Sequence, residues 1–150
     1  MLQSVKNPYP GDAATAEQLL QLATEYRTAA HTLRSQSKKG KPLSRAPCRL
    51  AAIHAIELYL NSLLLRKGME SAKVRSFKHG LVERGDLAAA NGLHLKRKTC
   101  SHLEAMTGSR EYLITRYGPE MTASMSEINR LMATLDEVGN KVSVIVAPQG

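Results

Sequence analysis

A line of polar side chains on an otherwise apolar segment is the feature of this sequence most able to support chemistry. His54, Glu57 and Asn61 share one face of a helix, and leucine, isoleucine and alanine dominate the surrounding residues 50–65. A buried carboxylate without a partner is strongly unfavourable, so Glu57 requires a cation or hydrogen-bond donors. We expect Arg110 to supply that charge. The line then belongs either to a structural buried ion pair or to a pocket in which polar groups converge on a ligand.

Positive charge is concentrated in three short stretches of the chain. The sequence carries 21 basic and 13 acidic residues, a net charge of +8, and the excess lies in residues 38–50, 73–84 and 96–98. If the helices alternate in direction, the first and last of these stretches meet at one end of the molecule. The patch expected there consists of Lys38, Lys39, Lys41, Arg45, Lys96 and Lys98. Such a patch attracts polyanions, including RNA and nucleotide phosphates, although solvated basic loops are the plainer interpretation.

Cysteine content and the absence of signature motifs exclude several classes of protein. Cys48 and Cys100 are too few for a disulfide scaffold and lack the CxxC spacing of a zinc site. The sequence has no glycine-rich phosphate loop, no GxSxG and no HExxH motif. We therefore expect no metal, no cofactor and a reducing, cytoplasmic environment. No apolar run reaches about 18 residues, and residues 1–10 lack the apolar core of a signal peptide, so we expect no membrane association.

Apolar periodicity predicts an all-α protein. A single domain is expected over residues 12–147, behind an irregular N-terminal segment over residues 1–11 that contains Pro and Gly. The β-branched run over residues 142–147 is assigned to the last helix, because the sequence shows no partner strand for it. Helices are predicted over residues 13–35, 46–67, 73–91, 101–117 and 125–147. The third of these is short and broken, so we expect an up-and-down bundle of four long helices plus one short helix.

Turn and cap residues set the predicted helix ends. Asp12 is the expected N-cap of the first helix, and Pro47 suits the first turn of the second. Gly68 is expected to end the second helix. Capping boxes are expected to begin at Ser101 and Ser124, because each serine is followed by a glutamate at the third position after it.

One run of residues is specific enough to suggest a family. Its core reads Ala55-Ile56-Glu57-Leu58-Tyr59-Leu60, followed by Leu63-Leu64, by Gly68 and by His79-Gly80-Leu81. This run resembles the HEPN superfamily of helical bundles, and Arg116-Tyr117-Gly118-Pro119 is similar to an Arg-Tyr-Pro element of some members. The sequence departs from the pattern at Asn61, where many relatives carry Lys.

The resemblance implies a helical bundle that commonly forms homodimers. It also implies a prokaryotic role in a toxin–antitoxin, defence or nucleotidyltransferase-associated system, with a nucleotidyltransferase or an antitoxin as protein partner. The preferred reading is a non-catalytic module that binds nucleotide, RNA or a partner protein. The candidate ligand-binding residues are His54, Glu57, Asn61, His79, Arg110 and Arg116.

A second reading of the same resemblance is an enzyme. Some HEPN proteins are metal-independent ribonucleases with an Arg-x4–6-His signature, and Arg49 with His54 and Arg97 with His102 both have this form. Arg97 and His102 fit the family's location better, because Arg49 and His54 lie inside a helix expected to be buried. His102 would then act as general acid or base while Arg97 holds the scissile phosphate. A third reading is a structural bundle whose exposed apolar stripe binds a partner helix.

Overall fold

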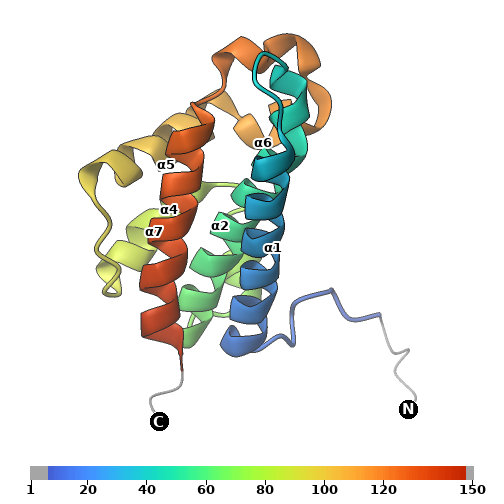
Figure 1. The fold of residues 1–150 in the computed structure, drawn as a ribbon. Coiled ribbons are helices and arrows are strands. Elements are labelled where there is room, and N and C mark those ends of the chain that lie inside the picture. Colours follow the sequence, from blue (N-terminus) through green and yellow to red (C-terminus); the bar gives the residue numbers. More distant parts are fainter. Residues whose placement is uncertain (1–6, 148–150) are drawn as a thin grey trace.

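Three long helices form the body of the molecule. The structure is a computed structural model that describes residues 7–147. Helices α1 (Ala16–Gln36), α2 (Ala46–Arg66) and α7 (Ile128–Val146) run side by side, with α2 between the other two (Figure 1). The described residues contain no strand, so the expected all-α fold is confirmed, including the assignment of the β-branched run to the end of α7.

Helix α2 is the centre of the hydrophobic core. Its apolar side chains cover nearly the whole circumference, which suits a helix surrounded by others. It packs against α1 and α7, and also against α4 (Leu81–Ala90) and α6 (Glu111–Tyr117). The stretch Pro42–Arg66 contains an 18-residue window that is apolar enough to cross a membrane. However, 72% of that window is buried inside the bundle. A central core helix has the same composition, so this finding does not favour a membrane span.

The apolar stripe of α7 faces the interior of the same chain. Leu131, Leu135, Val138 and Val142 are fully buried, and they join the core that α1 and α2 form. A Cβ added at Gly139 would lie 3.0 Å from Cε2 of Tyr59, so α7 approaches α2 closely at this glycine. The stripe is therefore already covered within one chain, and it does not need a partner helix.

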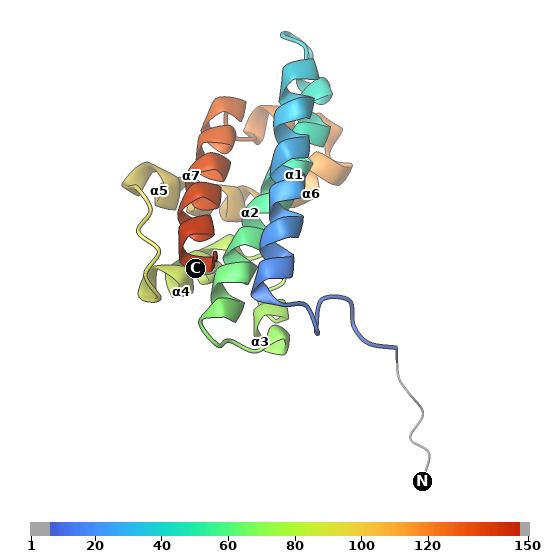
Figure 2. The ribbon, with the colours of Figure 1, turned by 60° about the horizontal axis from the view of Figure 1, so that its bottom comes forward.

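The remaining helices are shorter. In Figure 2, α4 and α5 (Arg97–Ser109) lie on the side of α7, and α3 (Ser71–Arg75) lies beyond the end of α2. The predicted helix over residues 73–91 is divided into α3 (Ser71–Arg75) and α4. The predicted helix over residues 101–117 begins earlier, as α5 (Arg97–Ser109), and ends at Arg110, whose φ of 54° is left-handed. Helix α6 then starts in a new direction. Two 3-10 helices, η1 (Pro42–Arg45) and η2 (Pro119–Ser124), precede α2 and α7. The count of four long helices and one short helix is therefore not confirmed.

Several predicted caps are wrong because other residues satisfy the helix ends. The first helix starts after Thr15, which forms a capping box with Gln18, and not after Asp12. Residues 7–11 are irregular as expected, and so are residues 13–15, where a helix was predicted; residues 1–6 of the predicted N-terminal segment lie outside the described range.

The capping boxes expected at Ser101 and Ser124 do not form either. At the start of α5, Glu137 of α7 accepts hydrogen bonds from the backbone N–H of Lys96, at 2.7 Å, and from the hydroxyl of Thr99, at 2.5 Å. The N-cap of α7 is Glu127 and makes no side-chain cap hydrogen bond. At the start of α5, a carboxylate distant in sequence therefore has the role that a local serine was expected to play.

The two basic stretches expected to form one patch lie in different places. The turn that carries Lys38, Lys39 and Lys41 lies at the top of the bundle, whereas the first turn of α5, with Lys96 and Lys98, lies at its left-hand side (Figure 1). Helix α5 crosses the bundle instead of alternating with the long helices, so the rule of alternating direction fails at this point. These exposed cations form two separate basic surfaces.

Candidate functional site

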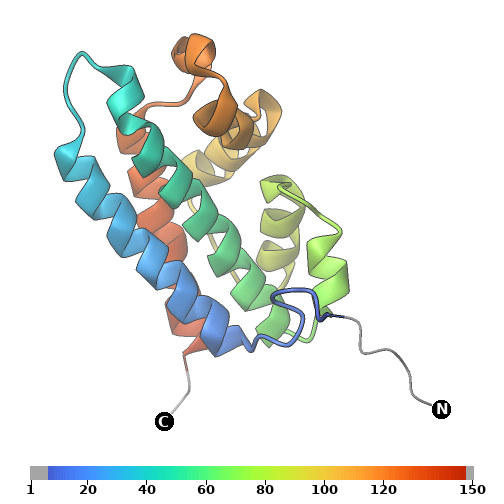
Figure 3. The same ribbon diagram turned by 90° about the vertical axis from the view of Figure 1, so that its right-hand side faces the viewer.

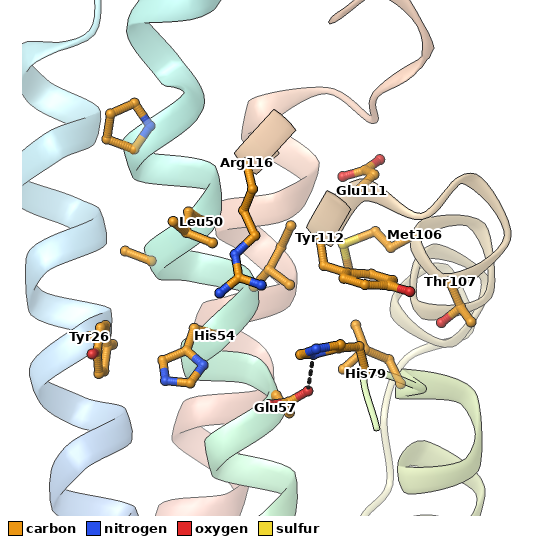
Figure 4. Close-up of a pocket in the computed structure, with 14 residues that line it drawn as sticks. Tyr26, Leu50, His54, Glu57, His79, Met106, Thr107, Glu111, Tyr112 and Arg116 are labelled. Carbon is orange, nitrogen blue, oxygen red and sulfur yellow. Dashed lines mark hydrogen bonds and ion pairs between the residues drawn. The ribbon is translucent and has the colours of Figure 1, made fainter. Parts of the chain in front are cut away.

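A cavity of about 330 Å³ opens beside the middle of α2 and is called the first cavity below. Its walls come from α1, α2, α5 and α6, with the start of α4 (Figure 4). Apolar side chains form much of its lining, among them Leu50, Ile53, Leu81 and Met106. The polar residues that line it are Tyr26, His54, Glu57, His79, Thr107, Glu111, Tyr112 and Arg116, although the carboxylate of Glu111 is bonded to Ser126 in the core. Four of the six predicted ligand-binding residues therefore share one cavity.

The imidazole of His79 lies between a carboxylate and an aromatic ring. Its Nδ1 atom is 3.2 Å from Oε1 of Glu57, and its ring stacks on Tyr112 at 4.6 Å between centroids, with 28° between the planes. Figure 4 shows this sandwich at the edge of the cavity. The His79 side chain is 49% exposed, whereas that of Glu57 is 15% exposed. A ligand can therefore reach the ring while the carboxylate stays sheltered behind it.

His54 lies across the cavity, on α2. Its ring meets Tyr26 of α1 edge to face at 4.5 Å. Burial lowers the pKa of His54; Arg116 and His79 lower it further, while Glu57 opposes the shift. The ring is therefore neutral at pH 7, with nitrogens able to exchange hydrogen bonds or protons. The exposed guanidinium of Arg116 extends from α6 toward this ring (Figure 4).

Arg84 holds the turn that positions His79, and sequence reasoning did not identify this residue. Its side chain is 2% exposed. It donates hydrogen bonds to Oδ1 of Asn61, at 2.7 Å, and to the carbonyl oxygens of Lys78, at 2.7 Å, and Gly80, at 2.9 Å. The two carbonyls flank His79 in the chain, so Arg84 sets the direction from which that ring enters the cavity. Arg84 lies three residues after Leu81 and therefore on the same buried face of a helix, and this spacing could have identified it from the sequence.

The partners of Glu57 come from other positions than the expected one. The structure pairs it with His79 and, at 3.9 Å, with the NH2 group of Arg84. Arg110 does not line the first cavity; it is exposed at the junction of α5 and α6. The prediction of Arg110 as partner was wrong because it assumed one continuous helix, and the left-handed residue at this junction changes the register of all that follows.

His102 and Arg97, the predicted catalytic pair, do not share a cleft. Arg97 is exposed on the first turn of α5, whereas His102 is 5% exposed. Its Nδ1 lies 2.7 Å from the hydroxyl of Thr134, and its Nε2 lies 2.9 Å from the hydroxyl of Ser126. Burial, helped by Arg130 and Arg49, lowers the pKa of His102 to about 4. Both ring nitrogens are already engaged inside the core, so neither can reach a phosphate.

The same interior region holds a second acid and a second arginine. Glu111 is 1% exposed and accepts hydrogen bonds from the backbone N–H of Ser126, at 2.5 Å, and from its hydroxyl, at 3.1 Å. Arg49 is 6% exposed and donates to the carbonyl oxygen of Ser126 at 2.7 Å. We call His102, Glu111, Arg49, Ser126 and Thr134 the core polar cluster. Because Arg49 belongs to this cluster, it does not join His54 in a catalytic pair.

The described residues offer no metal centre. They contain no group of three or more His, Cys, Asp or Glu side chains placed to hold an ion. Cys48 is buried and Cys100 is exposed, and neither forms a disulfide. Comparisons of the chain with protein-family models, with curated proteins and with solved structures find no match.

Proposed function

We propose that this chain is a HEPN-type helical module that binds nucleotides or short RNA in the first cavity without cleaving them. The observation that carries the proposal is the grouping of a stacked His79–Tyr112 pair, apolar walls and Arg116 around one opening. Support for the family assignment comes from the all-helical fold and from Glu57 and His79, two residues of the resemblance that meet in the cavity. A role in a prokaryotic toxin–antitoxin, defence or nucleotidyltransferase-associated system is part of the same proposal.

The chemistry of each group suits a part of a nucleotide. A flat base stacks on the exposed face of the His79–Tyr112 pair, as bases do on aromatic platforms in other nucleic-acid-binding proteins. The carboxylate of Glu57 accepts hydrogen bonds from amino groups on the edge of the base. The guanidinium of Arg116 bears the charge that a 5′-phosphate requires, and its planar fork matches the phosphate oxygens.

Calorimetric titration with AMP and with adenosine tests the proposal. We expect AMP to bind more tightly than adenosine, and Tyr112→Ala to weaken AMP binding about tenfold, since base–aromatic stacking contributes about 1–3 kcal/mol. Arg116→Gln should remove most of the preference for AMP over adenosine. Arg110→Gln is the matched control, because it removes an exposed arginine that does not line the cavity. Binding that is absent at low salt, or equally weakened by both arginine variants, contradicts the proposal.

A second candidate function at the same cavity is metal-independent RNA cleavage. Two histidines, His54 and His79, line the cavity together with Arg116. Such a reaction needs a general base, a general acid and a cation for the phosphate, and these three side chains are of those types. An RNA cleavage assay decides between the candidates. Loss of cleavage in both His54→Ala and His79→Ala, but not in the surface variant His94→Ala, would favour the enzyme.

A protein partner forms the other half of the proposal. Several large apolar side chains stay exposed, among them Leu43 at 56%, Tyr117 at 74% and Met121 at 45%. A second copy of the chain, or a nucleotidyltransferase or antitoxin, would cover such residues. Light scattering at micromolar concentration tests the homodimer; a monomer would remove it from the proposal.

A further inference from the structure

A second cavity, of about 730 Å³, adjoins the first on the side of the chain's N-terminal segment. His54, Glu57 and His79 line both cavities, so the hydrogen-bonded pair of Glu57 and His79 lies between them. The second cavity is bounded by α2, by α3 and its following turn, and by residues 9–12. Any ligand that fills the first cavity therefore has a neighbouring space for a further group.

The second cavity differs from the first in its charge. Arg75, Lys78 and Arg84 line it, against the carboxylates of Glu57 and Asp12. Arg84 is already engaged by backbone carbonyls and Asn61, as described above. Among the described residues, Lys78 makes no side-chain hydrogen bond or ion pair, and Arg75 is 40% exposed. Two cations are therefore available for an anion that enters from solvent.

The N-terminal segment occupies the position beside one of these cations. The carboxylate of Asp12 pairs with the NH1 group of Arg75, and the ring of Tyr9 lies 4.2 Å from the guanidinium carbon. The hydroxyl of Ser71 donates to the backbone carbonyl of Asp12 at 3.2 Å. Figure 3 shows this segment crossing in front of the bundle beside α3. The chain thus places an acid of its own on the arginine at the rim of the cavity.

We propose that the second cavity is a phosphate-binding subsite, formed by Arg75 and Lys78, in which Asp12 takes the place of the ligand's phosphate. A polyphosphate chain displaces the Asp12 carboxylate from Arg75, so residues 9–12 compete with the ligand. The ligand class is a nucleoside di- or triphosphate, with its terminal phosphates in the second cavity. This inference rests on the proposed function for the placement of the base, but the phosphate subsite itself can be tested without a base.

Inorganic triphosphate is the probe, because it lacks a base and does not depend on the first cavity. Calorimetric titration of the full chain is expected to show binding that weakens as salt increases. Asp12→Asn should tighten that binding about 2- to 5-fold, since an exposed ion pair of this kind contributes up to about 1 kcal/mol. Glu17→Gln is the matched control, because Glu17 pairs with Arg66 at similar exposure, away from the cavity. Equal tightening in both variants, or none in Asp12→Asn, overturns the competition.

The cations are tested in the same titration. Arg75→Gln should weaken triphosphate binding about tenfold or more, because a charge-assisted hydrogen bond to phosphate is lost. Lys78→Gln should weaken it as well, whereas Lys73→Gln, which removes a lysine that does not line the cavity, should not. Equal losses in the two lysine variants would mean that triphosphate responds to net charge alone and would overturn the subsite. If triphosphate binds as expected while AMP does not, the subsite stands and the proposed function fails.

Displacement of the segment has its own readout. The chain contains no tryptophan, so Tyr9→Trp introduces a single indole beside Arg75. Saturating triphosphate should shift its emission to longer wavelength, because the indole leaves the guanidinium and enters water. Unchanged emission at saturation would show that the anion binds without moving residues 9–12, and it would overturn the proposed competition.

Discussion

The core polar cluster and the first cavity contain the same types of residue, yet only one of them is open to a ligand. Each has a histidine, a glutamate and an arginine: His102, Glu111 and Arg49 in the cluster, and His54, Glu57 and Arg116 in the cavity. In the cluster every one of these side chains is less than 9% exposed. In the cavity Arg116 is exposed and the other two are partly exposed.

The difference lies in what satisfies each polar group. Ser126 alone bonds to His102, Glu111 and Arg49, through its hydroxyl, its N–H and its carbonyl oxygen. These internal hydrogen bonds offset the free-energy cost of burying the polar groups, and they leave few donors or acceptors free for a ligand. In the cavity, Glu57 has partners while the guanidinium of Arg116 makes no hydrogen bond or ion pair among the described residues. Residue type alone therefore does not identify a functional site; unfilled bonding capacity at an opening does.

Replacing the acid in each region should give the largest contrast. Glu111→Ala is expected to lower the free energy of unfolding by about 3 kcal/mol, because it removes the acceptor of the Ser126 N–H and hydroxyl and the negative charge near the buried Arg49. Glu57→Ala should change it by about 1 kcal/mol, since part of its surroundings is solvent. Urea denaturation measures both, with Glu104→Ala, an exposed residue of α5, as control. Equal losses for Glu111→Ala and Glu57→Ala would contradict the proposed difference between the core polar cluster and the first cavity.

Acid should destabilise the protein through the cluster. The pKa of His102 is lowered from 6.5 to about 4, so between these values the unfolded chain binds a proton that the folded chain rejects. Stability from this residue is therefore present at neutral pH and lost as pH falls. The expected loss between pH 7 and pH 4.5 is about 2 kcal/mol. His102→Gln should lose about 2 kcal/mol less over the same range; an unchanged pH dependence in this variant would contradict the assignment.

Substitution of His79 should affect ligand binding more than folding. His79→Ala is expected to weaken AMP binding about tenfold, whereas His79→Phe keeps an aromatic face for the stack and should change it less than about threefold. Both variants should unfold within about 1 kcal/mol of the parent protein, because the contact with Glu57 is half-exposed on the histidine side. Titration calorimetry and urea denaturation give the two numbers. Equal weakening by Ala and Phe would show that the polar contact of His79 with Glu57, and not the aromatic stack, is what binding depends on.

Arg97→Gln should have the smallest effect. Arg97 is exposed and makes no ion pair among the described residues, so the free energy of unfolding should change by less than about 0.5 kcal/mol. AMP binding should also stay the same. If an RNA cleavage activity is found and Arg97→Gln abolishes it, Arg97 is a catalytic residue after all and cleavage does not take place in the first cavity.

Local sequence patterns predicted the helices better than their ends. The apolar circumference of α2 and the stripe of α7 indicated which segments are helical, and α2 starts at the expected residue. The break at Arg110 was not predicted, because a left-handed backbone is usually expected at glycine and not at arginine. The starts of α5 and α7 were also missed, since Glu137 and Glu111, each far along the chain, satisfy backbone groups there.

The amino-acid sequence by itself determined the all-helical class, the central place of α2, and the line of His54 and Glu57 along one helical face. These depend on spacing along the chain, which a regular helix converts directly into position. Only the tertiary structure decided that His79 meets Glu57, that Arg84 holds the turn between them, and that His102 is enclosed in the core. Such pairings depend on how helices cross, and each buried polar group takes whichever partner the packing brings within hydrogen-bond distance.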